Sequence, residues 1–125
     1  MKTVLVIDDE LAYLAVVQKA LEPHFNVLTA VDGEEGLALA LEKKPDLILA
    51  DILMPKKDGY YLVEQLRKHL DMRNTPVVLL TAVDETSSLL RVGELGVTDY
   101  LIKPFRLDEL IRLVHHYIRT GPPPF

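Results

Sequence analysis

Five side chains able to bind a metal ion or to transfer a charged group each stand at the end of an apolar segment: Asp8, Asp9, Asp51, Thr81 and Lys103. Carboxylates that lie close together repel one another, and a hard divalent cation removes that repulsion. Mg²⁺ prefers a few carboxylate oxygens, several waters and a phosphate oxygen. Two acids to hold the metal, a third as nucleophile, and a hydroxyl and an ammonium for phosphate oxygens are sufficient for phosphoryl transfer to Asp51.

These side chains converge only if the apolar segments ahead of them are parallel strands. Residues 4–7, 47–50 and 77–80 are continuous apolar runs, which are typical of central strands covered on both faces. Residues 25–29 and 98–102 interleave polar side chains and suit the edges of a sheet. The carboxyl ends of parallel strands lie at one edge, where open α/β sheets bind ligands. We therefore expect three carboxylates and one ammonium in a shallow crevice at that edge.

Segments with helical periodicity alternate with the apolar runs. The apolar positions expected to line the helices are, in chain order, Leu14, Val17 and Leu21; Leu37 and Leu41; Leu62, Leu66 and Leu70; Leu89, Val92 and Leu95; and Leu107, Leu110, Ile111, Val114 and Ile118. Such alternation predicts βαβ units with right-handed crossovers, and so an α/β fold.

Length and composition fit one ordinary globular domain. The 125 residues carry a net charge of −5 and no cysteine, which argues against direct nucleic-acid binding, a disulfide framework and a thiolate metal site. No apolar run is long enough to cross a bilayer, and a first strand that begins at Thr3 leaves no room for a signal peptide. We expect a soluble, cytoplasmic domain over residues 1–119, without membrane contact, and a Pro-rich tail or the start of a linker over 120–125.

Four motifs, in this order and at this spacing, resemble the receiver domain of bacterial response regulators over about residues 3–119. They are Val6-Ile7-Asp8-Asp9-Glu10, then Asp51-Ile52-Leu53-Met54-Pro55 with Asp58-Gly59, then Leu80-Thr81-Ala82, and Asp99-Tyr100-Leu101-Ile102-Lys103-Pro104-Phe105. The resemblance implies a doubly wound five-stranded parallel sheet of order 2-1-3-4-5, the flavodoxin-like or CheY-like (βα)5 fold. It also implies phosphorylation of Asp51 by a partner histidine kinase or a phosphotransfer protein.

Carried over position by position, the resemblance implies a metal site. Asp8 and Asp9 would hold Mg²⁺ together with Asp51 and the backbone carbonyl of Leu53. Glu10 would be an accessory that reaches the metal through water.

The resemblance further implies a phosphate-binding pair and a switch. Lys103 would pair with the phosphoryl group, aimed inward by a cis bond to Pro104, and Thr81 would be the hydroxyl that turns to a phosphate oxygen. Tyr100 resembles the aromatic that moves between exposed and buried positions, and Ala82 the small residue that leaves room. The surface from the fourth helix to the fifth would then be read by a partner or an output domain.

Plainer roles compete at each position. Asp8 or Asp9 would also suit the N-cap of the first helix, although two acids followed by Glu10 exceed what a cap needs. Thr81 would be ordinary at the end of a strand, and Tyr100 would be ordinary as a packed residue of an edge strand.

Two kinds of departure from the family pattern bear on phosphoryl lifetime and assembly. Leu53 and Val83, two places beyond the phosphoacceptor and the switch hydroxyl, are apolar and cannot guide an attacking water, so we expect a long-lived phosphoryl group and slow autodephosphorylation. Asp99 and Glu109 match the charges of a phosphorylation-dependent homodimer. Arg112 falls one place short of the usual arginine, and Leu89 replaces the usual lysine, which leaves the homodimer open.

Three other functions are compatible with such a fold. A small α/β phosphatase needs a second Asp two places beyond its nucleophile, where this chain has Leu53, so a turnover enzyme is disfavoured. A nucleotide or flavin module needs glycines or hydroxyls after the first strand, where Asp8-Asp9-Glu10 would repel phosphate. An interaction domain that is never phosphorylated would not need the acid, hydroxyl and lysine set.

Overall fold

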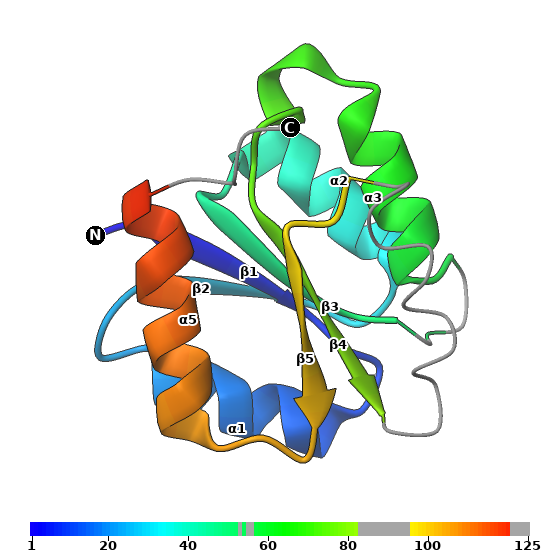
Figure 1. Ribbon diagram of the computed structural model, residues 1–125. Helices are drawn as coiled ribbons and strands as arrows, with labels where there is room; N and C mark the ends of the chain where they lie inside the picture. The colour runs from blue at the N-terminus through cyan, green and yellow to red at the C-terminus, as the bar shows by residue number, and fades with distance from the viewer. Residues whose placement is uncertain (53, 55–56, 83–95, 121–125) are drawn as a thin grey trace.

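Five parallel strands form one sheet in the order β2-β1-β3-β4-β5 (Figure 1). The computed structural model describes residues 1–52, 54, 57–82 and 96–120. The strands are β1 Thr3–Ile7, β2 Asn26–Ala30, β3 Leu47–Asp51, β4 Val77–Ala82 and β5 Asp99–Lys103; the helices are α1 Leu11–Leu21, α2 Gly33–Lys43, α3 Gly59–Arg67, the short 3-10 helix η1 Leu70–Met72, and α5 Leu107–Thr120. The predicted strand order and the predicted edge positions of β2 and β5 are confirmed.

Successive residues of a strand point to opposite faces of the sheet, which explains the continuous apolar runs. Val4 and Val6 of β1 join the core cluster on the side of α1 and α5, whereas Leu5 and Ile7 join the cluster on the side of α2 and α3. Figure 1 shows these two helix pairs on opposite sides of the sheet. Burying each such side chain contributes roughly 1.5–3 kcal/mol, so a polar residue inside a central strand would be costly.

Two helices that leave the functional edge of the sheet begin at aspartates. The Asp32 carboxylate accepts the Glu35 N–H at 2.8 Å ahead of α2, and the Asp58 carboxylate accepts the Tyr61 N–H at 2.9 Å ahead of α3. Each bond satisfies a backbone donor that the first helical turn leaves unpaired, which is typically worth about 1 kcal/mol.

Two helix-face predictions are wrong at their ends. Leu70 is 78% exposed because α3 ends at Arg67, and Leu70 begins η1 on a new axis. Leu107 is exposed because it is the first residue of α5, ahead of the turns that pack on the sheet. The predicted fourth helix, with Leu89, and the Pro-rich residues 121–125 lie outside the described residues.

Within the described residues, none of the helices has both the length and the apolar character that spanning a bilayer requires.

Candidate functional site

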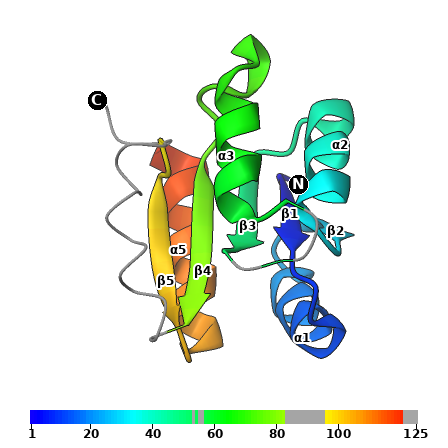
Figure 2. The ribbon, with the colours of Figure 1, turned by 90° about the vertical axis from the view of Figure 1, so that its right-hand side faces the viewer.

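The three aspartates of the sequence prediction lie together at the carboxyl edge of the sheet, toward which the arrowheads point in Figure 2. Asp8 follows β1, and Asp51 ends β3, which pairs with β1 in the register Ile7↔Ala50. One carboxylate oxygen from each of Asp8, Asp9 and Asp51 lies within 4.8 Å of the others. Since Asp8 is buried and Asp9 is exposed, the cluster runs from the interior to the surface.

Lys103 places its ammonium between two of these carboxylates. Its Nζ donates a hydrogen bond to Asp51 Oδ2 at 3.1 Å and lies 3.5 Å from Asp8 Oδ2. Burial lowers the pKa of Lys103, but the charge of Asp51, the hydrogen bond to it and the charge of Asp8 outweigh burial, so the pKa is raised above its usual value. The ammonium is therefore a fixed positive charge at neutral pH. The Lys103–Pro104 peptide bond is cis, as the resemblance implies.

Helix capping does not account for the buried aspartate. The N-cap of α1 is Glu10, whose side chain makes no capping bond. Asp8 Oδ1 accepts the Glu10 N–H at 3.0 Å, and Asp8 Oδ2 is buried with no hydrogen-bond partner among the residues that the structure describes. A buried carboxylate oxygen without a hydrogen-bond donor is costly, and the single charge of the Lys103 ammonium, which Asp8 shares with Asp51, does not balance three carboxylates. Together with two further carboxylates Asp8 offers the hard oxygen donors that suit Mg²⁺, so this donor set fits that ion.

Thr81 and Ala82 end β4, next to both Asp51 and Lys103 in the sheet. Asp51 pairs with Leu80, and Ala82 pairs with Lys103. Thr81 is fully buried, and its hydroxyl donates to the Ala82 carbonyl at 3.2 Å. The hydroxyl thus lies on the strand between the aspartate and the lysine.

Tyr100 does not join this cluster. Its side chain is 40% exposed on β5, which is an edge strand. Glu10 is also exposed, and Leu53 lies outside the described residues, so its carbonyl stays a prediction.

Tyr13 is a site residue that the sequence reasoning missed. The Lys103 ammonium lies 4.2 Å from the centroid of the Tyr13 ring, and the ring makes an edge-to-face contact with Phe105 at 6.0 Å. Burial raises the pKa of Tyr13. The sequence offers only a weak indication of this role, because the buried face of α1 runs through Leu14, Val17 and Leu21, and Tyr13 lies next to that face rather than in it.

The Asp58-Gly59 motif supports the backbone of β3 at the end where Asp51 lies. The Gly59 N–H donates to the Ile52 carbonyl at 2.9 Å. A Cβ atom on Gly59 would lie 2.7 Å from the carbonyl oxygen of Asp51, so α3 can approach β3 this closely only without a side chain. The motif therefore acts through the main chain next to Asp51.

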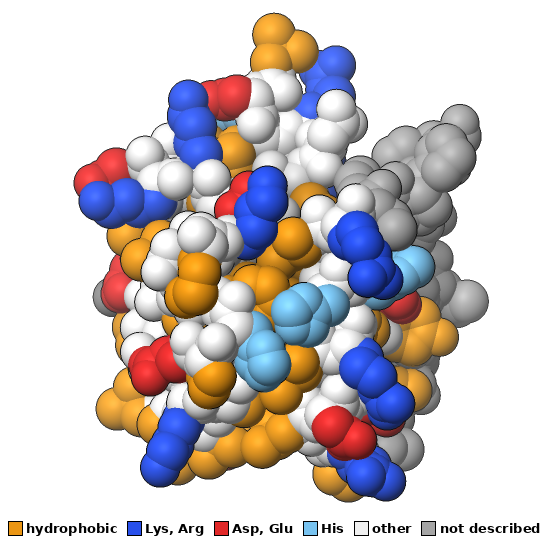
Figure 3. Space-filling model, turned by 90° about the vertical axis from the view of Figure 1, so that its left-hand side faces the viewer, with side chains coloured by type: hydrophobic (Ala, Val, Ile, Leu, Met, Phe, Trp, Pro, Cys, Tyr) orange, Lys and Arg blue, Asp and Glu red, His pale blue; other side chains and the backbone are white. Residues whose placement is uncertain are grey.

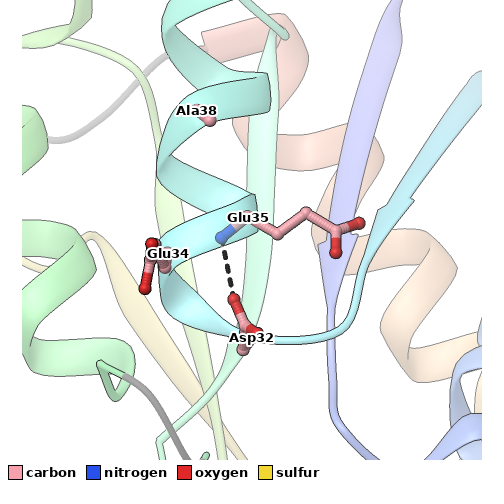
Figure 4. Close-up of a pocket in the computed structure, with 4 residues that line it drawn as sticks. All are labelled: Asp32, Glu34, Glu35 and Ala38. Carbon is pink, nitrogen blue, oxygen red and sulfur yellow. Dashed lines mark hydrogen bonds between the residues drawn. The ribbon is translucent and has the colours of Figure 1, made fainter.

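A separate acidic hollow lies at the start of α2, lined by Asp32, Glu34, Glu35 and Ala38, with a volume of about 260 Å³ (Figure 4). The Asp32 side chain points at the Glu35 N–H as the helix cap. Acids in a first helical turn are favoured by the helix dipole, so local helix chemistry explains this lining.

Asp99 of β5 and Arg112 of α5 both have partners within the chain. Asp99 accepts hydrogen bonds from the Tyr117 hydroxyl at 2.6 Å and from the Tyr100 N–H at 2.7 Å. Arg112 pairs with Asp108 at 3.7 Å. Burial and then the bond to Asp99 raise the pKa of Tyr117 to about 12.

Comparison with known proteins shows to which family this chain belongs. The sequence profile of the response regulator receiver domain matches residues 4–115. The chain belongs to the response regulator receiver domain family. It is 41% identical to the alkaline phosphatase synthesis transcriptional regulatory protein PhoP of Bacillus subtilis, over 96% of this chain and 50% of that protein. It is 37% identical to the DNA-binding dual master transcriptional regulator RpaA of Synechocystis, over 95% of this chain and 50% of that protein.

Solved receiver domains have the same fold. A Francisella response regulator receiver domain superposes with a TM-score of 0.85 at 36% identity, covering 95% of this chain and 98% of that one. The receiver domain of a sensor histidine kinase from Pseudomonas aeruginosa has a TM-score of 0.88 at 28% identity, covering 95% and 98%, and holds a magnesium ion in its active-site cleft. This receiver domain spans about half the length of the curated relatives it matches.

Proposed function

We propose that Asp51 of this receiver domain accepts a phosphoryl group from a histidine kinase or a phosphotransfer protein. The observation that carries the proposal is the Lys103 ammonium, held 3.1 Å from Asp51 Oδ2 where three carboxylates meet. An Asp51 oxygen attacks the phosphorus of a phosphohistidine. The P–O bond forms as the P–N bond breaks, and the histidine nitrogen takes up a proton.

The residues that would hold Mg²⁺ are Asp8, Asp9 and Asp51, with the backbone carbonyl of Leu53. Asp8 Oδ2 supports this assignment, because it is buried and accepts no hydrogen bond from the described residues. When bound, the ion would supply positive charge that offsets the repulsion between the carboxylates and the incoming phosphoryl oxygens. Lys103, whose ammonium lies between Asp51 and Asp8, would neutralise part of the same charge.

The switch follows from where the neighbouring groups lie before phosphorylation. The Thr81 hydroxyl leaves the Ala82 carbonyl and donates to a phosphoryl oxygen, and Tyr100 turns inward from its exposed position. Moving a two-state equilibrium from 1:99 to 99:1 takes about 5.5 kcal/mol. Two or three hydrogen bonds to a charged group, at about 1.5–3 kcal/mol each, supply that difference.

The altered surface of β5, α5 and the predicted fourth helix would control a partner protein or an output domain in the cytoplasm. Nucleic-acid contacts of the whole protein would lie outside this chain. Its net charge is −5, and Figure 3 shows Lys and Arg mixed with Asp, Glu and His on the face near α5. Asp99 already bonds Tyr117 within the chain, which disfavours its use in a homodimer ion pair.

Intact mass spectrometry after incubation with phosphoramidate, with and without Mg²⁺, tests the phosphoacceptor. We expect a Mg²⁺-dependent, hydroxylamine-labile gain of one phosphoryl group in the wild type and none in Asp51→Asn. Asp71→Asn is the matched control, because Asp71 is an exposed aspartate that pairs with Lys44 at 2.9 Å, outside the crevice. An adduct that persists in Asp51→Asn would place the phosphoryl group elsewhere. If no adduct survives to mass analysis, titration with beryllofluoride, a stable phosphoryl mimic that binds the acceptor carboxylate itself, tests the same site.

A further inference from the structure

We infer that Tyr13 is a positioning residue for Lys103, whose ammonium it holds at the crevice with its ring face. The inference rests on the proposed phosphoryl transfer to Asp51, and it adds a residue of α1 to the groups that serve that transfer. None of the four motifs of the sequence includes Tyr13.

Three groups surround the ammonium. Lys103 Nζ lies 4.2 Å from the centroid of the Tyr13 ring, 3.1 Å from Asp51 Oδ2 and 3.5 Å from Asp8 Oδ2. A cation within about 6 Å of an aromatic centroid is attracted by the negative ring face, more strongly when water is partly excluded. The Lys103 side chain is 22% exposed, so the contact is partly desolvated.

The ring itself is fixed from two sides. Tyr13 lies in the first turn of α1, and its ring meets Phe105 at 6.0 Å with an interplanar angle of 83°. Both rings pack against the core cluster on the side of α1 and α5. The Tyr13 ring is therefore held by packing, and its contact with Phe105 connects α1 to the turn after Lys103.

An aliphatic residue would fill the same space but has no negative face for an ammonium. A carboxylate at this place would attract the ammonium but compete with the phosphoryl oxygens for its N–H donors. The ring attracts without accepting a directed hydrogen bond, and its 6 Å range covers small displacements of the ammonium. Tyr13 thus limits the rotamers of the long Lys103 side chain without using any of its N–H donors, one of which bonds Asp51 Oδ2.

The kinetic test compares variants that keep or remove the ring. With phosphoramidate and Mg²⁺, we expect Tyr13→Leu to be phosphorylated about fivefold more slowly and Tyr13→Phe within about twofold of the wild type. Tyr61→Leu is the matched control, since it removes a second tyrosine–lysine contact, to Lys57 at 5.0 Å on α3, and should leave the rate unchanged. Tyr13→Met, which also lacks the ring, replaces Tyr13→Leu if that variant fails to fold.

A double-mutant cycle separates positioning from general support of the fold. If Tyr13 acts through Lys103, Tyr13→Leu causes no further slowing in a Lys103→Met background. A wild-type rate in Tyr13→Leu, or an undiminished fivefold loss in that background, overturns the inference.

A readout without phosphoryl chemistry is the resonance position of the Lys103 ε-methylene protons in the metal-free protein. Ring current shifts them upfield in the wild type and in Tyr13→Phe, and they return to ordinary values in Tyr13→Leu. Unshifted wild-type resonances overturn the contact by themselves. If the wild type accepts no phosphoryl group, the phosphoacceptor proposal is wrong, and the resonances still decide whether Tyr13 holds Lys103.

Discussion

The substitution Gly59→Ala has two opposing effects on the stability of the fold, and their magnitudes predict which one is larger. Alanine is favoured over glycine in a helix by at most about 1 kcal/mol, so helix propensity alone predicts a stabilised α3. The new Cβ would lie 2.7 Å from the Asp51 carbonyl oxygen and 3.1 Å from the Ile52 Cα, both main-chain atoms that cannot rotate away. Overpacking typically costs about 1–3 kcal/mol, and a clash with main-chain atoms belongs in the upper part of that range, at about 2–3 kcal/mol; subtracting about 1 kcal/mol of helix propensity leaves a net loss of about 1–2 kcal/mol.

Thermal unfolding measures this loss. An unfolding entropy of about 2.1 cal/mol/K per residue means that a chain of 125 residues loses about 4 °C of Tm per kcal/mol. Gly59→Ala should therefore lower Tm by about 4–8 °C. Because the clash falls on the backbone of the proposed phosphoacceptor, phosphorylation by phosphoramidate should also slow by at least about tenfold.

Ala15→Gly is the matched control for Gly59→Ala. Ala15 is exposed in α1, away from the crevice, and glycine there should cost about 1 kcal/mol through helix propensity alone. It should lower Tm by about 4 °C with an unchanged phosphorylation rate. A Gly59→Ala protein with wild-type Tm and wild-type rate would refute the packing argument.

Three further predictions follow from the charges and bonds described. Lys103→Met removes the cation nearest the carboxylates, so calorimetry should show about tenfold tighter Mg²⁺ binding while phosphorylation slows; weaker binding would contradict the electrostatic reasoning. Burial and then the bond to Asp99 raise the pKa of Tyr117 from 10.0 to about 12, so the neutral hydroxyl in its folded environment stabilises the fold below pH 10, and this stabilisation is lost as pH rises through 12. Tyr117→Phe should remove that part of the alkaline loss in urea unfolding, and identical pH profiles would count against it. Leu53→Asn with Val83→Glu should shorten the phosphoryl half-life, measured by phosphate release, because both new side chains can guide an attacking water; an unchanged half-life would refute that reasoning.

The strand framework was predictable because burial on both faces has a simple signature. A central parallel strand must be apolar at every position, so residues 47–50 and 77–80 could be read directly. Helix ends were less predictable, as Leu70 shows, because periodicity continues past the point where the chain turns onto a new axis. Where the buried face of a helix ends depends on how that helix packs against neighbouring elements, and no local sequence pattern encodes this packing.

The sequence alone determined which groups reach the functional edge, because parallel strands carry the residues at their ends to one side of the sheet. Asp8, Asp51 and Lys103 follow from that rule. Only the tertiary structure decided that the ammonium lies 3.1 Å from Asp51, that Asp8 Oδ2 is buried without a hydrogen bond from any described residue, and that the Tyr13 ring lies 4.2 Å from the Lys103 ammonium. Those distances depend on how α1 and the turn after β5 pack against each other across 90 residues of chain between Tyr13 and Lys103. The spacing of residues along the sequence indicates which of them end the strands. Contacts between distant segments depend instead on how the whole sheet and its helices pack.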